Sequence, residues 1–133
     1  MKKDLDSMFE KPYWIMDILP GQVPANSPGQ YFAAEKFFLE KPQLTAVKQK
    51  HAEVILKLNC YRDISVDEGV SVNPPPEEIF NTVMTQPVNI CVDDSMIVSA
   101  PDELYLTVYN PDENLLNLLQ KLCIGEGLYL WRP

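Results

Sequence analysis

Short runs in which hydrophobic and polar or aromatic residues alternate recur along the chain and predict β-strands. In residues 104–109 and 128–131, leucine or valine occupies every second position, and tyrosine, threonine or tryptophan stands between them. The linkers 93–95 and 100–103 are short enough for hairpins, so residues 88–109 are predicted to form an antiparallel meander of three strands. The predicted strands are 13–19, 63–66, 88–92, 96–99, 104–109 and 128–131.

Two segments with a helical repeat of apolar residues begin at a proline. Proline is tolerated in the first turn of a helix, where its missing N–H costs no hydrogen bond. Ser27 and Gln30 are three residues apart, which is the spacing of a capping box, and Pro28 takes the first helical position between them. This pattern predicts a helix from Pro28 that stops near Lys41. Pro42 then opens a second helix, because apolar residues follow it at helical spacing through residue 58.

Two further helices are predicted in the second half of the chain. Residues 73–78 contain three prolines and two glutamates and open the third helix. The fourth is predicted to have Asn110 as its N-cap, Pro111 at its first position and Glu113 at the third. Leucines form its buried stripe, and the region of Gly125 ends it.

The predicted order of elements, β-α-α-β-α-β-β-β-α-β, mixes helices with hairpins and indicates an α+β fold. We predict a single α+β domain over residues 1–133, with a mostly antiparallel sheet of about five strands and helices mainly on one face. The last strand follows a helix. We therefore expect it to lie parallel to one of its neighbours after a right-handed crossover.

Charge is distributed unevenly along the 133 residues, whose net charge is −8. Residues 1–58 carry eight basic and seven acidic side chains, whereas residues 59–133 carry three basic and twelve acidic ones. Between Arg62 and Lys121 there are eleven carboxylates and no lysine or arginine. Such a surface repels phosphate backbones and anionic lipids, so we expect neither nucleic acid nor a membrane as partner. Basic proteins and cations are the charged partners that it allows.

The cysteines and the first residues point to a cytoplasmic protein. Cys60, Cys91 and Cys123 are odd in number and widely spaced, as is typical of a reducing compartment. The lysines after Met1 are followed by acidic residues and not by an apolar run, so no signal peptide is predicted. No segment approaches the roughly 20 apolar residues that a membrane span needs.

Four carboxylates at one end of the predicted meander could form a divalent-cation site. The turn at Asp93 and Asp94 and the helix start at Asp112 and Glu113 fall at the same end, because strand 104–109 returns there. Hard cations prefer such oxygen ligands. Ordinary turn and cap chemistry also explains these residues, and no calcium-loop pattern is present. We therefore predict no metal and no cofactor.

The single histidine, His51, lies on the apolar stripe of the second predicted helix. A partly buried histidine can act as a general base. No serine or cysteine nucleophile with a third, orienting group can be assigned beside it. We therefore interpret His51 as a histidine at the edge of the core with one hydrogen bond, and we assign no catalytic residue. Phosphate-binding, nucleophile-elbow and zinc-protease motifs are also absent from the sequence.

Aromatic residues gather on one face of the predicted sheet. Tyr105, Tyr109, Tyr129 and Trp131 alternate with aliphatic residues that the leucine-rich helices are expected to cover. Tyrosine and tryptophan are enriched at protein interfaces, so this face is predicted to meet solvent, loops or another protein. An open alternative is that the aromatic segment 9–14 covers the face as part of the core. Stacking of RNA bases is disfavoured by the surrounding negative charge.

The favoured hypothesis is a protein-binding or regulatory module that acts through an acidic, aromatic-edged surface. Its partner would be a protein with a basic face or a second copy of the chain, and an inhibitor of a basic enzyme or a nucleic-acid mimic would be a special case. The alternative is a small enzyme or divalent-cation-binding protein that uses the carboxylate cluster and His51, and a third is a small-molecule pocket between sheet and helices. The predicted binding residues are Asp93, Asp94, Tyr105, Tyr109, Asp112, Tyr129 and Trp131.

Overall fold

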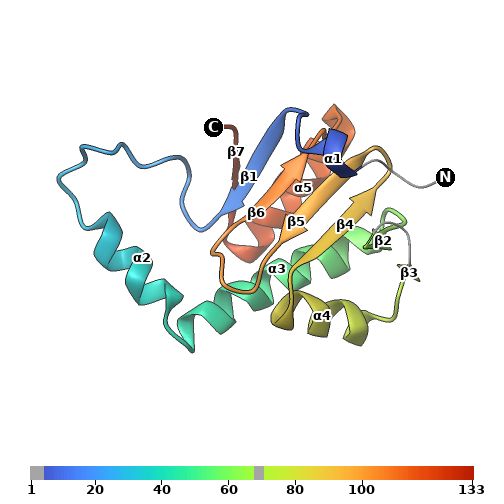
Figure 1. Ribbon diagram of the computed structural model, residues 1–133, viewed down its shortest axis with the longest axis horizontal. Helices are drawn as coiled ribbons and strands as arrows, with labels where there is room; N and C mark the ends of the chain where they lie inside the picture. The colour runs from blue at the N-terminus through green and yellow to red at the C-terminus, as the bar shows by residue number, and fades with distance from the viewer. Residues whose placement is uncertain (1–4, 68–70) are drawn as a thin grey trace.

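The computed structural model describes residues 5–67 and 71–133 and has an α+β fold (Figure 1). In this part of the chain, seven strands form one sheet in the order β3-β2-β4-β5-β6-β1-β7, and every pairing is antiparallel. The elements are α1 (Leu5–Met8), β1 (Tyr13–Asp17), α2 (Tyr31–Leu39), α3 (Gln43–Asn59), β2 (Ser65–Val66), β3 (Ser71–Val72), α4 (Pro76–Thr85), β4 (Val88–Val92), β5 (Ser95–Ser99), β6 (Leu106–Tyr109), α5 (Glu113–Glu126) and β7 (Tyr129–Trp131).

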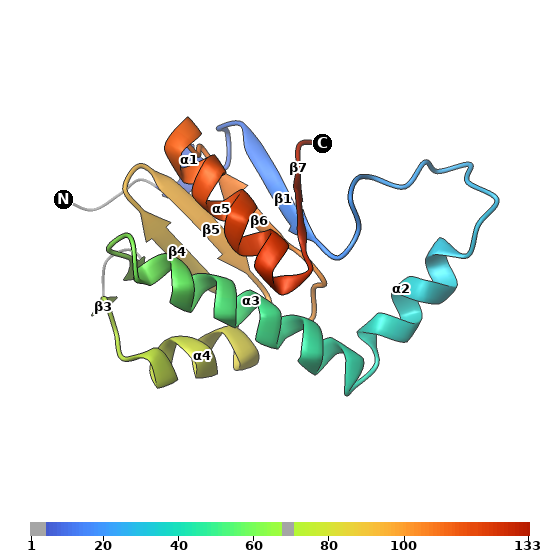
Figure 2. The ribbon, with the colours of Figure 1, turned by 180° about the vertical axis from the view of Figure 1, so that it is seen from behind.

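Helices α3 and α5 lie across one face of the sheet, and α4 packs beside α3 (Figure 2). The period-2 pattern explains this layer, because Leu106 and Val108 of β6 both point into the core and are fully buried. Ile55 of α3 and Leu119 of α5 belong to the same hydrophobic cluster. Each such side chain contributes roughly 1.5–3 kcal/mol when it is removed from water. Among the described residues, no helix is long and apolar enough to cross a membrane.

The predicted meander is confirmed as β4, β5 and β6, but the sheet is larger than the predicted five strands. Strand β2 lies within the predicted strand 63–66, whereas β3 was not predicted; each is only two residues long. The sequence of β3 carries no strand pattern of its own. Strand β3 pairs with β2, so that Ser71 lies opposite Val66 and Val72 lies opposite Ser65.

The expectation for the last strand is wrong. Strand β7 pairs only with β1 among the described residues, and it does so antiparallel, with Ile15 opposite Trp131. Strand β1 also pairs antiparallel with β6 on its other side. The crossover through α5 therefore connects two strands that run in the same direction, but β1 is inserted between them.

Two helix starts differ from the predicted capping boxes. Helix α2 begins at Tyr31, because the Ser27 hydroxyl accepts a hydrogen bond from the N–H of Gly29 instead of capping a helix. Helix α5 begins at Glu113, with Asp112 as its N-cap. Asn110 adopts a left-handed conformation with φ of 58° and donates from its side chain to the carbonyl of Asp94. Its role is thus to hold a turn against the β4–β5 hairpin.

Residues 18–41, which link β1 to α3 and contain α2, extend away from the rest of the molecule (Figures 1 and 2). We call this segment the arm. No residue of α2 is buried. The arm joins α3 at Lys41 and Pro42 through a cis peptide bond.

The face of the sheet opposite α3 and α5 is only partly covered. The short helix α1 lies on this side, as Figures 1 and 2 show from opposite directions. Its Met8 packs against Cys91 of β4 and Met96 of β5. This contact covers the region of β4 and β5 and leaves β6, β1 and β7 without a helix over them.

Candidate protein-binding surface

An aromatic groove lies on the uncovered region of β6, β1 and β7. Tyr13 stands opposite Tyr109, and Ile15 stands opposite both Thr107 and Trp131. Residues opposite each other in antiparallel strands share a face, so these side chains point to the same side of the sheet. They form an open groove of about 400 Å³, lined by Tyr13, Ile15, Asp17, Tyr105, Thr107, Tyr109, Trp131 and Pro133.

The aromatic segment 9–14 covers only one end of this groove. The ring of Phe9 meets the ring of Tyr109 edge to face, with their centroids 5.2 Å apart. Trp14 instead packs with the helix-side core. Tyr13 remains 42% exposed and Tyr105 39% exposed. Segment 9–14 therefore does not bury the aromatic face as part of the core, and most of the face stays accessible to solvent.

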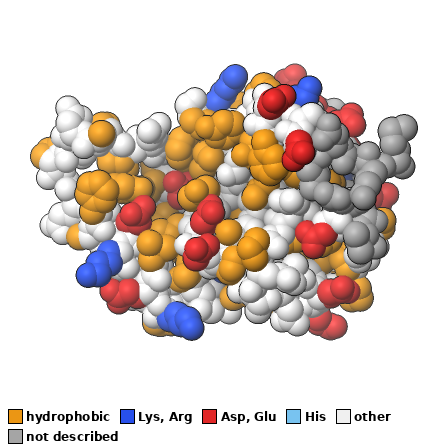
Figure 3. Space-filling model, viewed as in Figure 1, with side chains coloured by type: hydrophobic (Ala, Val, Ile, Leu, Met, Phe, Trp, Pro, Cys, Tyr) orange, Lys and Arg blue, Asp and Glu red, His pale blue; other side chains and the backbone are white. Residues whose placement is uncertain are grey.

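Tyr129 lies beside the groove, opposite Asp17 in the pairing of β7 with β1, and is 49% exposed. Figure 3 views this face and shows hydrophobic side chains with carboxylates among them. The lysine and arginine side chains visible in that view lie at the margins. The face formed by β6, β1 and β7 thus carries exposed aromatic side chains and little positive charge, as the sequence predicted.

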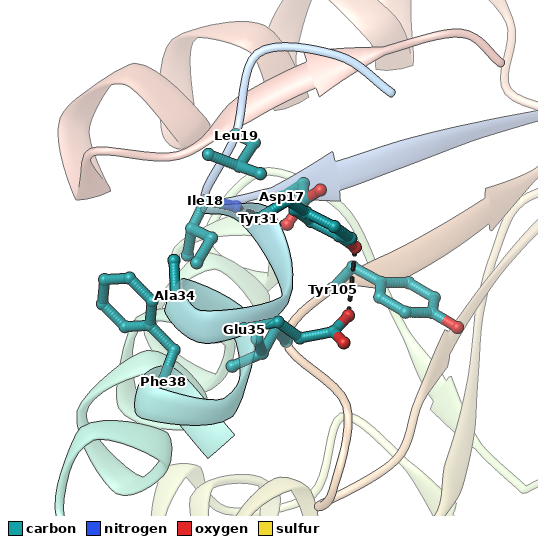
Figure 4. Close-up of a pocket in the computed structure, with 9 residues that line it drawn as sticks. Asp17, Ile18, Leu19, Tyr31, Ala34, Glu35, Phe38 and Tyr105 are labelled. Atoms are coloured by element: carbon teal, nitrogen blue, oxygen red, sulfur yellow. Dashed lines mark hydrogen bonds between the residues drawn. The ribbon is translucent and has the colours of Figure 1, made fainter. Parts of the chain in front are cut away.

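A second cavity, which we call the arm pocket, lies between the arm and the sheet (Figure 4). Tyr31, Glu35 and Phe38 of α2 follow the i, i+4, i+7 spacing and form the helix side that faces it. Leu104 and Tyr105, just before β6, form part of the opposite wall. The pocket has a volume of about 90 Å³, and its lining residues are Asp17, Ile18, Leu19, Tyr31, Ala34, Glu35, Phe38, Leu104 and Tyr105.

Asp17 and Tyr105 line both the groove and the arm pocket, so the two form one continuous surface. Burial raises the pKa of Asp17, and the negative charge of Glu35 adds to this effect, while the Ile18 N–H opposes it by donating to Oδ1 at 2.7 Å. The hydroxyl of Tyr31 donates to Glu35 Oε2 at 3.0 Å. Carboxylates therefore meet at the junction of groove and pocket.

Burial and nearby negative charges raise the pKa of the Tyr105 hydroxyl. Burial, together with hydrogen bonding to Glu103 and the charges of Glu103 and Asp17, raises the pKa of Tyr105 to about 12. Among the described residues that line the groove or the arm pocket, there is no lysine or arginine. Carboxylates beside tyrosine rings suit a cationic group, which carboxylates attract by charge and rings by their π faces.

The three predicted aspartates do not line this surface. Asp93 accepts a hydrogen bond from Arg62 Nη1 at 2.6 Å in an ion pair, and Asp94 contributes its backbone carbonyl to the contact with Asn110. Asp112 caps α5 by accepting from the N–H of Leu115 at 2.7 Å. These groups lie at the hairpin end of the sheet with local structural roles. Another member of the acidic stretch, Glu68, falls outside the described residues.

The structure gives the divalent-cation alternative no geometric support. Within residues 5–67 and 71–133, no group of three or more histidine, cysteine, aspartate or glutamate side chains is arranged to hold a metal ion. Of the carboxylates predicted for this role, Asp93 is paired with Arg62, and Asp112 is occupied as a helix cap.

The capping role of Asp112 can be tested by substitution. We expect Asp112→Ala to lower the free energy of unfolding by about 1 kcal/mol, because the N–H of Leu115 loses its acceptor. Asp112→Asn keeps an acceptor and should lie within about 0.5 kcal/mol of the wild type. Urea unfolding followed by circular dichroism measures both. A larger loss in the asparagine variant would show that the charge, rather than the cap, is what matters.

His51 differs from its predicted role at the edge of the core. Its side chain is fully buried, and neither ring nitrogen makes a hydrogen bond of standard geometry, although a weaker contact with the backbone of Leu104 favours the protonated ring. Burial, with the positive charge of Lys48 as the next cause, lowers the pKa of His51 to about 3. The imidazole is therefore neutral at physiological pH.

Lys48, which the sequence reasoning missed, is 1% exposed and donates from Nζ to Ser99 Oγ at 3.0 Å. Burial lowers its pKa to about 8, and the charges of Glu103 and Asp102 oppose that shift. A lysine with a lowered pKa beside a serine can in principle act as a base. Ser99 is itself buried, and neither residue lines the groove or the arm pocket, so no substrate path reaches this pair from that surface.

Comparison with known proteins found no matching family model and no significant match among curated proteins or solved structures. We therefore infer the function from the geometry of this chain alone. Sequence reasoning also missed Asp17, Tyr31 and Glu35. Asp17 carried a signal, since it is the one charged residue in the apolar run 13–19. Tyr31 and Glu35 carried the helical spacing but no indication of what they would face.

Proposed function

We propose that this protein is a protein-binding module whose binding surface is the aromatic groove together with the arm pocket. The observation that carries the proposal is a preformed sheet face on which several tyrosines remain partly exposed around a junction of carboxylates. Contiguous apolar patches of this kind mark interaction sites, and tyrosine and tryptophan dominate the energy of interfaces. A strand scaffold holds them in place, which reduces the entropy lost on binding.

The chemistry of the surface defines the partner that it would recognise. Aromatic rings in the groove favour an apolar segment, and Asp17 and Glu35 favour a basic side chain within that segment. The net charge of −8 would speed the approach of a basic partner and would disfavour nucleic acids. The described chain contains three free cysteines and no disulfide, which fits the proposed cytoplasmic location.

Site-specific photo-cross-linking tests this proposal. A photoreactive phenylalanine derivative is placed at Tyr105 or Tyr129 on the surface, or at Ile124, which is 66% exposed on α5. After irradiation in the native cell extract, we expect protein adducts from the first two positions and none from Ile124. The adducts should decrease with rising salt, because screening weakens the approach of a charged partner. Adducts of equal yield at Ile124, or none at Tyr105 and Tyr129, would contradict the proposal.

A further inference from the structure

The arm exposes hydrophobic side chains that its own chain does not bury. Phe32 of α2 is 78% exposed and Phe37 is 52% exposed. A helix of nine residues is marginal in water on its own, and most helical stability in proteins comes from packing of an apolar side. The side of α2 that carries Tyr31, Glu35 and Phe38 faces the arm pocket, which leaves the outer side without a covering element.

The outer side of α2 has the chemistry that the binding surface would select. Phe32, Lys36 and Leu39 follow the i, i+4, i+7 spacing and form one stripe, and all three are exposed. This stripe places a single cation between two apolar side chains. Amphipathic helices commonly bind by laying such a stripe into a groove. The aromatic groove would take the apolar residues, and the carboxylates of Asp17 and Glu35 would take the ammonium group of Lys36.

Charge permits the arm to approach the groove of a second copy. The arm carries Glu35, Lys36, Glu40 and Lys41, so its net charge is zero in a chain of net charge −8. Residues 59–133, which contribute β6 and β7 to the groove, have three basic and twelve acidic side chains. Two copies approaching through these acidic regions would repel each other. An arm approaching a groove avoids that repulsion and supplies Lys36 to the carboxylates.

We propose that the occupant of the binding surface is the arm of a second copy of this chain, so that two copies exchange their arms. This inference rests on the proposed function, because it names the partner of the same surface. The arm leaves β1 directly after Asp17, and Asp17 lines the groove. Arm and groove are therefore neighbours. A two-fold axis beside β1 can place the arm of each copy on the groove of the other copy. Such an interface uses the same patch on both subunits, which is usual for dimers.

The first test is the mass of the purified full-length chain in solution, measured by light scattering and sedimentation over a concentration series. We expect a dimer of twice 15.2 kDa. The double variant Phe32→Ser/Leu39→Ser removes both apolar residues of the stripe and should weaken association by at least about tenfold. Both residues are exposed in the single chain, so its unfolding temperature measured under monomeric conditions should not fall. The matched control, Ile124→Ser, removes an equally exposed residue elsewhere and should leave the dimer unchanged.

Mixing variants tests the exchange itself. The arm variant Phe32→Ser/Leu39→Ser keeps an intact groove, and the groove variant Tyr105→Ala/Tyr129→Ser keeps an intact arm. Each variant alone should be monomeric at concentrations where the wild type is a dimer. Their mixture should form a heterodimer, because one of the two arm–groove contacts is still possible. A groove variant that dimerises on its own would mean that arms pack on arms, and a wild-type dimer combined with no association in the mixture would mean that no arm–groove contact forms; either result overturns the exchange.

The outcomes also separate this inference from the proposed function. A wild-type chain that stays monomeric up to about 1 mM overturns arm exchange. If cross-linking at Tyr105 then captures a different protein, the binding surface stands with another partner. If the wild type dimerises and the groove variant dimerises equally well, arm exchange fails. Absence of any adduct at Tyr105 and Tyr129 would then refute the binding surface as well.

Discussion

Lowering the pH from 7 to 5 should destabilise the fold by about 2 kcal/mol through His51. The folded-state pKa of His51 is about 3, below the ordinary value of 6.5. Between these values the unfolded chain binds a proton that the folded chain does not. The contribution of His51 to stability is therefore fully present above pH 6.5 and is lost progressively as the pH falls toward 3.

The variant His51→Leu should lose this pH dependence, and urea unfolding of both proteins at pH 5 and pH 7 measures the difference. His51 is the only histidine, so no other imidazole contributes. Neither ring nitrogen makes a hydrogen bond of standard geometry, so leucine sacrifices only the weak contact with the backbone of Leu104. The variant should be at least as stable as the wild type at pH 7, because burying an unpaired polar group costs about 1–3 kcal/mol. Identical slopes between pH 5 and pH 7 in the two proteins would exclude a buried neutral histidine.

Replacement of Lys48 by methionine should raise the free energy of unfolding at pH 7 by about 2 kcal/mol. The folded-state pKa of Lys48 is about 8, compared with 10.5 as its ordinary value. Keeping the charge in the core at pH 7 therefore costs on the order of 3 kcal/mol. Loss of the hydrogen bond to Ser99 offsets about 1 kcal/mol of the gain. Methionine has a similar unbranched shape and fills the space of the lysine stem.

The pH dependence identifies the source of this gain. Between pH 8 and 10.5 the unfolded wild-type chain keeps the lysine proton and the folded chain has lost it, so the contribution of Lys48 to stability should rise with pH over this window. Burial raises the pKa of the Cys123 thiol to about 12, which opposes this rise above pH 9 in the wild type and the variants alike. Lys48→Met should remove that rise, whereas Lys121→Met, at an exposed position of α5, should retain it. Urea midpoints at pH 7 and pH 9.5 make the comparison. A methionine variant with the same rise as the wild type would contradict a buried charge.

The two groups are also coupled. The positive charge of Lys48 is one cause of the low pKa of His51. In Lys48→Met the pKa of His51 should therefore move toward its ordinary value, and the loss of stability between pH 7 and pH 5 should become smaller. Neighbouring groups commonly show such non-additive effects, whereas distant ones do not.

Local patterns predicted the parts of the fold that are close in sequence. The meander of β4, β5 and β6 followed from alternation and short linkers, and α3 followed from its long apolar stripe. Position 48 shares the helical spacing of that stripe, but lysines are seldom fully buried and the pattern was interpreted with apolar residues alone. The place of β1 between β6 and β7 depends on contacts between distant segments, which no local pattern encodes.

The candidate surface was predictable to the same extent. Alternation in β6 and β7 predicted that Tyr105, Tyr109, Tyr129 and Trp131 share one side of the sheet. The strand pairings and the groove lining place them on that side. Asp93, Asp94 and Asp112 do not lie beside these residues, because turn and cap contacts hold the aspartates at the hairpin end. The arm pocket could not be foreseen, since it depends on how α2 is placed relative to β1.

The position of β1 also determines when the binding surface can exist. Tyr13 pairs with Tyr109, and Ile15 pairs with Trp131, so the groove combines segments from opposite ends of the chain. During synthesis, β1 emerges early and has no partner until β6 and β7 have been made. Pairings between such distant segments form slowly because a long loop must close first. A growing or incompletely folded chain therefore has no groove, and the proposed partner recognition would be restricted to molecules that have finished folding.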